Sequence, residues 1–136
     1  MDTIHLSTGE LRLEQLQKML IHLPVDLSFV DADDRVRFYS ESPHRVFPRS
    51  PQVIGRNVTD CHPKASVDKV REILDALRDG SRDRARFWIE SSGRFVIIQY
   101  IAVRDDAGSY LGCLEVSQDA TEIRALEGER RLADWS

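Results

Sequence analysis

The sequence has 136 residues, 41% hydrophobic and 31% charged, which is typical of one soluble globular domain with a single core. Its formal net charge of −4 argues against nucleic acid as the main partner. No apolar run approaches the ~18 residues of a membrane helix. The two cysteines suggest a reducing compartment without a disulfide framework, so we expect a cytoplasmic protein.

The chain begins with a segment that predicts an amphipathic helix over residues 8–22. Ser7 and Glu10 have the spacing of a capping box, and Pro24 ends the segment because the residue before proline avoids the helical region. The apolar stripe of this helix includes Leu16, Met19, Leu20 and Leu23. Two interpretations stay open: the stripe packs on the sheet of its own domain, or it pairs with a second copy and makes a homodimer.

Two short strands and a loop are expected next. Residues 25–31 alternate in polarity, the acidic segment 31–34 is typical of a turn, and residues 35–39 predict a second strand. Residues 40–55 contain three prolines, so we expect an irregular segment with short helical turns there.

The stretch with the clearest helical pattern is residues 64–79. Its apolar stripe comprises Val67, Val70, Ile73, Leu74 and Leu77. Gly80 follows as a helix stop, and residues 84–90 alternate in polarity as a third strand does.

The longest apolar stretch, residues 94–104, is rich in β-branched and aromatic residues, which is typical of a strand covered on both faces. An acidic turn that ends at Gly108 and the following run 110–118 predict a hairpin. Asp119 comes next as a candidate helix N-cap, whose side chain should accept a backbone N–H at the start of a C-terminal helix.

The hairpin that ends in Asp119-Ala120-Thr121 resembles the last two strands of a PAS domain. In that family an Asp-x-Thr triplet marks the junction between sensor and output helix. The resemblance implies an α+β fold: a five-stranded antiparallel sheet with helices on one face, plus an N-terminal amphipathic helix and a C-terminal exit helix. It divides the chain into the N-terminal helix 1–24, the PAS core 25–120 and the exit helix 121–136.

Several motifs make the resemblance more specific. "FYS…RVFPR", "GRNVTDCHP" and "YLGCLEVSQDAT" are similar to the bacterial PAS domain often found behind a hemerythrin-like domain. The four histidines of this chain are scattered and lack helical carboxylate partners, so no hemerythrin module is expected here. The resemblance does not imply a particular ligand.

Cys61 and His62 precede the long helix and are the most distinctive candidates for ligand binding. They either form a helix start with Pro63 or line the family's cavity and bind a metal, haem iron or an electrophile. The further candidate ligand-binding residues are Tyr39, His44, Arg56 and Gln99.

Two cofactors can be weighed against the family's patterns. Haem-binding PAS domains of the oxygen-sensor type carry a histidine in the long helix, and residues 64–79 contain none, so haem would need another ligand. Light-sensing PAS domains carry a cysteine directly after Gly-Arg-Asn; Val58 follows that triplet here, which argues against a photoactive flavin. The spacing of the histidines and cysteines matches no zinc pattern, so no metal site is expected.

These observations favour a sensory domain that binds a small molecule or cofactor and passes the signal through a dimer and the exit helix to an unidentified signalling protein. The alternative is a constitutive interaction or dimerisation module without a ligand. An enzyme is not expected, because no nucleophile and base have a helpful context.

Overall fold

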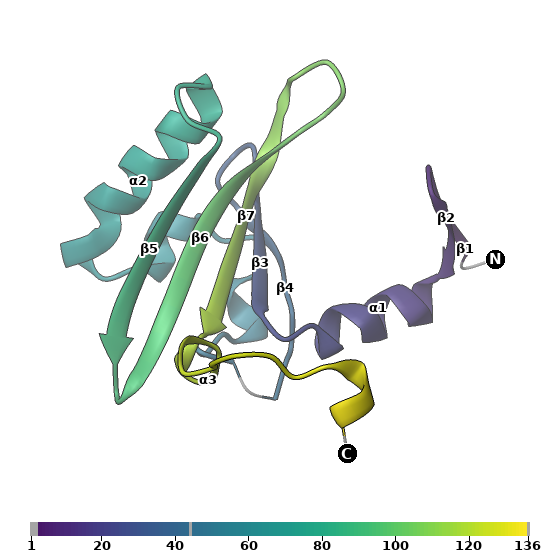
Figure 1. The fold of residues 1–136 in the computed structure, drawn as a ribbon. Helices are drawn as coiled ribbons and strands as arrows, with labels where there is room; N and C mark the ends of the chain where they lie inside the picture. The colour runs from purple at the N-terminus through teal and green to yellow at the C-terminus, as the bar shows by residue number, and fades with distance from the viewer. Residues whose placement is uncertain (1–2, 44, 136) are drawn as a thin grey trace.

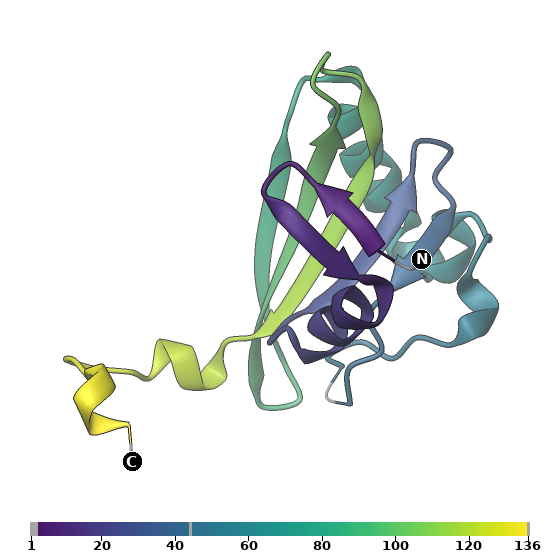
Figure 2. The same ribbon diagram turned by 90° about the vertical axis from the view of Figure 1, so that its right-hand side faces the viewer.

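The computed structural model describes residues 3–43 and 45–135. Its elements are β1 (Thr3–Leu6), β2 (Gly9–Arg12), α1 (Leu13–His22), β3 (Asp26–Asp31), β4 (Val36–Tyr39), η1 (Pro51–Val53), η2 (Val58–Cys61), α2 (Lys64–Asp79), β5 (Arg84–Ser91), β6 (Arg94–Arg104), β7 (Tyr110–Asp119), α3 (Thr121–Arg124) and η3 (Leu132–Asp134). Figures 1 and 2 show a central sheet with α2 on one face, an N-terminal segment on the other side and a C-terminal segment that leaves the sheet at one end. No helix among these described residues is long and apolar enough to cross a membrane.

The central sheet has five strands in the order β4-β3-β7-β6-β5, and every neighbouring pair is antiparallel. The predicted turn between β6 and β7 is present: the Gly108 N–H donates to the Asp105 carbonyl at 2.9 Å, and Gly108 has φ +86°. The predicted α+β fold, with a five-stranded antiparallel sheet and helices on one face, is confirmed.

The hydrophobic core lies between α2 and the face of the sheet that we call the inner face. The α2 stripe buries Val70, Leu74 and Leu77. These side chains cluster with Val30, Val36 and Cys113 of the sheet and Val58 of η2. Gly80 ends α2 in the left-handed conformation, as its position predicts. Burial raises the pKa of the Cys113 thiol to about 12, so this cysteine is an inert part of the core.

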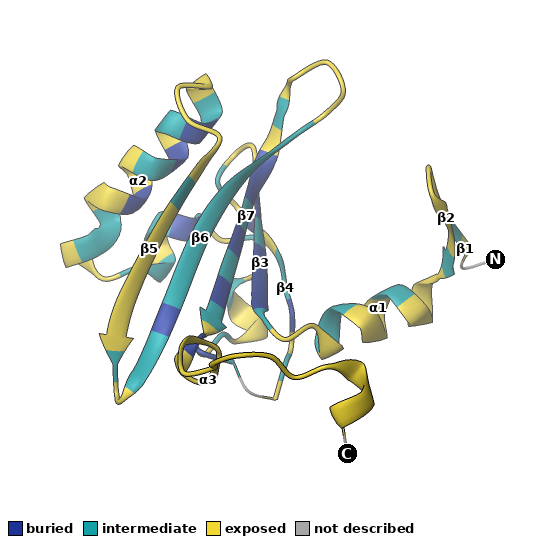
Figure 3. Ribbon diagram, in the orientation of Figure 1, coloured by how far each residue is buried: buried dark blue, intermediate teal, exposed yellow. Residues whose placement is uncertain are grey.

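The opposite face of the sheet, which we call the outer face, is apolar but only half-buried. Strand pairing places Leu114 opposite Phe29 on one side and opposite Ile101 on the other, all on this face. Trp88 of β5 lies opposite Ile97 and is 61% exposed. Figure 3 shows that β5, the strand at the edge, is exposed over most of its length.

The N-terminal segment differs from the prediction of one helix over residues 8–22. Residues 3–12 form the β1–β2 hairpin, and α1 begins only at Leu13. Ser7 lies in the hairpin turn and Glu10 in β2, where its carboxylate contacts His5 at 3.1 Å, so the predicted capping box is wrong. The box that starts the helix forms instead between the Arg12 N–H and the Gln15 side chain, 2.9 Å apart.

The predicted exit helix over residues 121–136 is also longer than the helix observed. α3 comprises only Thr121–Arg124, and a single turn at Leu132–Asp134 follows in the described part of the segment. Gly128 adopts φ +64°, which interrupts a right-handed helix. A short helix without a packed face is marginal in water, and Leu126, Leu132 and Trp135 are all largely exposed here.

Candidate functional site

A groove of about 780 Å³ lies between α2 and the inner face of β5 and β6. The helical period of α2 directs Val70, Ile73 and Leu77 into it. The period-2 alternation of the strands contributes Ala85, Phe87 and Ile89 from β5 and Ile98 and Tyr100 from β6. Because β5 is an edge strand, the groove opens to solvent beside it.

Two polar side chains with defined orientations face this apolar groove. The Nδ1 atom of His62 lies 2.9 Å from the Val58 carbonyl oxygen, an acceptor only, so Nδ1 carries the proton and Nε2 is the nitrogen that can meet a ligand. Burial raises the pKa of Tyr100 well above its ordinary value, so its hydroxyl stays protonated and can donate a hydrogen bond. The Tyr100 ring is held edge-to-face by Phe87, with ring centroids 6.3 Å apart.

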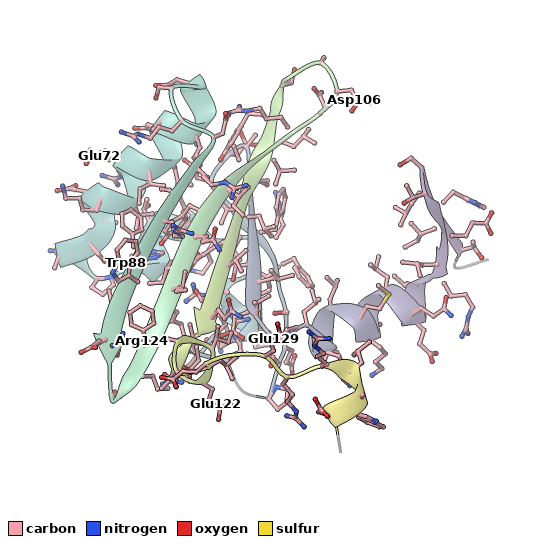
Figure 4. All side chains as sticks on the ribbon, in the orientation of Figure 1. Glu72, Trp88, Asp106, Glu122, Arg124 and Glu129 are labelled. Atoms are coloured by element: carbon pink, nitrogen blue, oxygen red, sulfur yellow. The ribbon has the colours of Figure 1, made fainter. Side chains whose placement is uncertain are left out.

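The charged residues that line the groove are Lys69 and Glu72 from α2, Arg82 from the turn before β5 and Arg86 from β5, and all four are exposed. Figure 4 labels Glu72 on α2 and Trp88 on β5, the two elements on either side. An apolar interior with a few oriented polar groups and a charged rim is the usual composition of a small-molecule site.

A second polar cluster lies on the inner face under residues 40–50. Glu115 is 8% exposed and lies 3.6 Å from the Arg49 guanidinium. The neighbouring Arg45 donates to the Phe47 carbonyl at 3.1 Å and stacks 5.3 Å above the Tyr39 ring. Burial lowers the pKa of Arg45, yet the nearby Asp26 carboxylate favours its charged form. The arginines here are therefore paired with the protein's own groups.

The structure does not bring the predicted ligand-binding residues together. Of the six candidates, His62 lines the groove, whereas the Cys61 thiol lies at the end of η2 and is 3.8 Å from the Asn57 carbonyl. Tyr39 packs against Arg45, away from the groove. Gln99 lies opposite Val116 on the outer face.

Arg56 and His44 are the other two predicted ligand-binding residues. The Arg56 side chain is exposed, and its carbonyl accepts from the Val36 N–H at 3.0 Å in a strand-like contact. His44 lies outside the described residues. Among those described, no three or more His, Cys, Asp and Glu side chains are grouped so that they could hold a metal ion.

Most of the groove-lining residues were not among the predicted ligand-binding residues. Ile98 and Tyr100 share one face of β6, and Phe87 and Ile89 share one face of β5, because side chains alternate along a strand. The signal that would have selected them is the strand order, because only pairing between β5 and β6 places both sets on the face covered by α2.

At the junction after β7, hydrogen bonds link Asp119 to Thr121 and Thr121 to Phe95. Asp119 Oδ1 accepts from the Thr121 N–H at 3.0 Å and from the Thr121 hydroxyl at 2.6 Å. Thr121 Oγ1 in turn accepts from the Phe95 N–H at 2.8 Å, which ties the start of α3 to the start of β6. Arg124 lies 4.3 Å from the Phe95 ring centroid, beside the β5–β6 turn, where Figure 4 labels it.

Replacing Asp119 should loosen this junction. In Asp119→Ala we expect faster hydrogen exchange at the Thr121 and Phe95 amides. The Thr121 amide loses its acceptor, and the Thr121 hydroxyl that accepts from the Phe95 amide is no longer held by the Asp119 carboxylate. The hydrogen bonds from the Thr121 hydroxyl and backbone lower the pKa of Asp119, so the stabilisation is present at neutral pH and is lost as pH falls through that lowered pKa. Asp119→Asn keeps an acceptor oxygen and is the matched control; equal exchange in the alanine variant and the wild type would contradict the assignment.

Known protein families and solved structures include proteins that are similar to this chain. The chain matches the PAS domain family over residues 16–121. It shares 39% identity with the crystal structure of a C-terminal domain from Streptococcus mutans, covering 92% of this chain and 97% of that one with a TM-score of 0.86. No curated protein matches.

More distant solved structures share the fold. A PAS domain from Colwellia psychrerythraea is 14% identical over 81% of this chain and 98% of its own, with a TM-score of 0.60. A sensory box sensor histidine kinase from Vibrio cholerae is 18% identical over 78% of this chain and 89% of its own, with a TM-score of 0.57.

Proposed function

Because the chain belongs to the PAS domain family, whose members are typically sensory and signalling modules, we propose that it is a sensor that binds a small molecule in the groove between α2 and strands β5 and β6. The observation that carries the proposal is the groove, whose volume of about 780 Å³ falls among those of small-molecule sites (~300–1,000 Å³). His62 Nε2 and the Tyr100 hydroxyl would orient the ligand, and the aliphatic side chains would bury its apolar part.

The route of the signal follows from the strand that lines the groove. Ile98 and Tyr100 lie on β6, and the first residues of this strand bond to the junction through Phe95 and Thr121. A ligand that displaces the two groove side chains would shift β6, and the Asp119–Thr121 arrangement would transmit the shift to α3 and to a partner protein. The receiving partner would be a signalling protein.

Further parts of the proposal rest on the sequence. The chain would act as a bacterial, cytoplasmic sensor without catalytic activity, of the subgroup that accompanies hemerythrin-like domains. Neither a nucleic acid nor a membrane would be among its partners. If haem were the ligand, the His62 ring would be the side chain of the groove that holds its iron.

Ligand binding can be tested by native mass spectrometry and absorbance of freshly purified protein. Ala76 lines the groove and Ala65 lies exposed on the same helix, so Ala76→Phe fills the site while Ala65→Phe adds the same ring outside it. We expect a copurified small molecule in the wild type and in Ala65→Phe and its loss from Ala76→Phe; His62→Ala should weaken its retention. If folded Ala76→Phe protein kept the molecule, the molecule would bind outside this groove and the proposed site would be wrong.

The second candidate function is a constitutive interaction module. The observation that favours it is the edge strand β5, where Phe87 is 42%, Trp88 61% and Ile89 41% exposed, so both faces of the strand offer apolar contact surface. Wild-type protein that carries no small molecule from its natural host would favour this candidate.

We also propose a homodimer in which the apolar side of α1 takes part. No residue of α1 is buried within the chain, although its helix is amphipathic. We expect a dimer at tens of micromolar by light scattering, and a monomer after Leu16→Glu with Leu20→Glu, because two carboxylates would be placed in the apolar contact. Gln17→Glu, which adds charge at an exposed position of the same helix, should stay dimeric; a monomeric wild type would end the proposal.

A further inference from the structure

Strand β5 leaves one edge of the central sheet uncovered. Among the described residues it pairs with β6 alone, over its full length and without a bulge. The opposite edge strand, β4, has four residues, and Val36 within it exchanges backbone hydrogen bonds with Gly55 and Arg56. β5 is twice as long and contains neither proline nor lysine, two residues with which edge strands prevent further pairing. It is therefore a surface to which another strand can add.

The pairing of β5 with β6 decides which backbone groups face the open edge. The Ala102 N–H of β6 donates to the Asp83 carbonyl at 2.9 Å, so residue 83 directs its backbone groups toward β6. In an antiparallel pair this direction alternates from one residue to the next. The residues of β5 whose N–H and C=O groups point away from β6 are therefore Arg84, Arg86, Trp88 and Glu90.

These outward groups restrict how β5 can pair with β5 of a second copy. A two-fold axis between two residues would set outward groups opposite groups already bonded to β6, so the axis must pass through a residue that lies opposite itself. At Arg86 it would set two arginines opposite each other, which is unfavourable. At Trp88 it would leave Arg84 opposite a residue beyond the end of the strand, and axes closer to either end would pair fewer residues. At Phe87 it sets Arg84 opposite Glu90 and Arg86 opposite Trp88, so both arginines have a complementary partner.

We propose that β5 pairs with β5 of a second copy in antiparallel orientation, about a two-fold axis at Phe87. Residues 84–90 of the two strands then lie opposite each other and join the two sheets into one. The Glu90 carboxylate lies 3.7 Å from Arg124 of its own chain through one oxygen, Oε1, which leaves Oε2 for Arg84 of the second copy. Two such ion pairs form, because the axis repeats every contact.

The pairing also adds a wall to the groove. Phe87 lines the groove beside the open edge and is 42% exposed. On the inner face it would meet Phe87 of the second copy, and the two rings would cover apolar surface at the side where the groove meets solvent. Ala85 would lie opposite Ile89 on the same face. Each copy would thus help to enclose the groove of the other.

This contact is separate from the contact proposed for α1 and does not require a bound ligand. One strand buries less surface than a standard interface does, so we expect the pairing to be weak and to form above the tens of micromolar used to test the α1 dimer. Absence of a copurified molecule, or a monomer at tens of micromolar, would therefore leave the β5 pairing standing.

Disulfide cross-linking tests the pairing and its register. Residue 87 would form a non-hydrogen-bonded pair with itself, whose Cα atoms are ~4.5 Å apart, within the range of a disulfide. In a Cys61→Ser background, concentrated Phe87→Cys protein under mild oxidation should therefore give a covalent dimer on a non-reducing gel. Cys113 is buried in the core and does not compete.

Trp88→Cys in the same background is the matched control. The two copies of residue 88 would lie diagonally, ~7–8 Å apart, so a disulfide between them is unfavourable. Position 88 is nevertheless more exposed than position 87, 61% against 42%, so random collision would cross-link it at least as well. We expect far less covalent dimer from this variant.

A change of charge tests the ion pairs at both ends of the paired strands. Arg84→Glu, added to the Phe87→Cys protein, should slow cross-linking about fivefold, because carboxylates would then lie opposite each other twice. Arg71→Glu makes the same change on an exposed residue of α2 that does not line the groove and should leave the rate nearly unchanged.

Three results would overturn the pairing. Equal cross-linking at positions 87 and 88 would indicate random collision. Faster cross-linking at position 88 would mean that the strands meet about a different axis. Phe87→Cys protein that circular dichroism shows to be folded, and that stays unlinked, would mean that the edge does not pair with a second copy and is left to a strand of another protein.

Discussion

Leu77→Ala is expected to lower the free energy of unfolding by about 3 kcal/mol, in the range found for large-to-small core substitutions. Leu77 is 0% exposed and packs at the centre of the cluster between α2 and the inner face. Its truncation leaves a cavity, because the rigid sheet on one side and the helix on the other cannot close over it. For a domain of this size the loss corresponds to a melting temperature lower by roughly 10 °C.

Urea unfolding of the wild type and of Leu77→Ala measures this loss of free energy. The matched control is Leu132→Ala, which removes the same atoms from a side chain that is 93% exposed and should change the free energy by less than about 0.5 kcal/mol. Similar losses for both variants would mean that α2 does not form the core described above.

Gly112→Ala is the second substitution with a large expected effect. Gly112 has φ +152°, and a Cβ atom there would lie 2.6 Å from Phe29 Cζ and against the Val30 carbonyl oxygen. Overpacking and backbone strain each cost about 1–3 kcal/mol, so we expect a loss of about 3 kcal/mol in the free energy of unfolding. The clash would fall at the pairing of β3 with β7, in the centre of the sheet.

Gly108→Ala separates steric clash from backbone strain. Gly108 also has a positive φ, +86°, but a Cβ atom there would meet nothing within 4 Å. It should cost about 1 kcal/mol, because only the strain remains. Equal losses at the two glycines, measured by the same urea titration, would show that a shift of β3, which carries Phe29 and Val30, relieves the close approach at Gly112.

Most elements of the central sheet could be predicted because their signals are local. The alternation in residues 84–90, the apolar stretch 94–104 and the turn at Gly108 each specify a conformation by the periods of side chains along a few residues. The helix 64–79 is predicted with its bounds for the same reason. Its stripe repeats over about three turns, and Gly80 adopts the conformation that ends the helix.

The two ends of the chain could be predicted only in part. Residues 3–12 contain leucine and isoleucine at positions that suit either a hairpin or the beginning of a helix. The Ser7–Glu10 spacing favours a helix start, but Ser7 and Thr8 form a turn and Ile4 pairs with Leu11, so the segment is a hairpin. Beyond Arg124, helix propensity is overruled because every described residue of the predicted helix there is exposed and no apolar side is buried.

The sequence by itself determined the fold family, the strand faces and the helical stripe, because these depend on periodicity and on the Asp119-Ala120-Thr121 triplet. It did not determine which face of each strand meets α2, since alternation is the same for both faces and only strand order distinguishes them. The tertiary structure therefore decided that His62 faces the groove with Tyr100, while Gln99 turns to the opposite face. It also decided that the N-terminal segment of β1, β2 and α1 stands apart from the central sheet, because a connection of a few residues at Pro24 sets the direction of the whole helix.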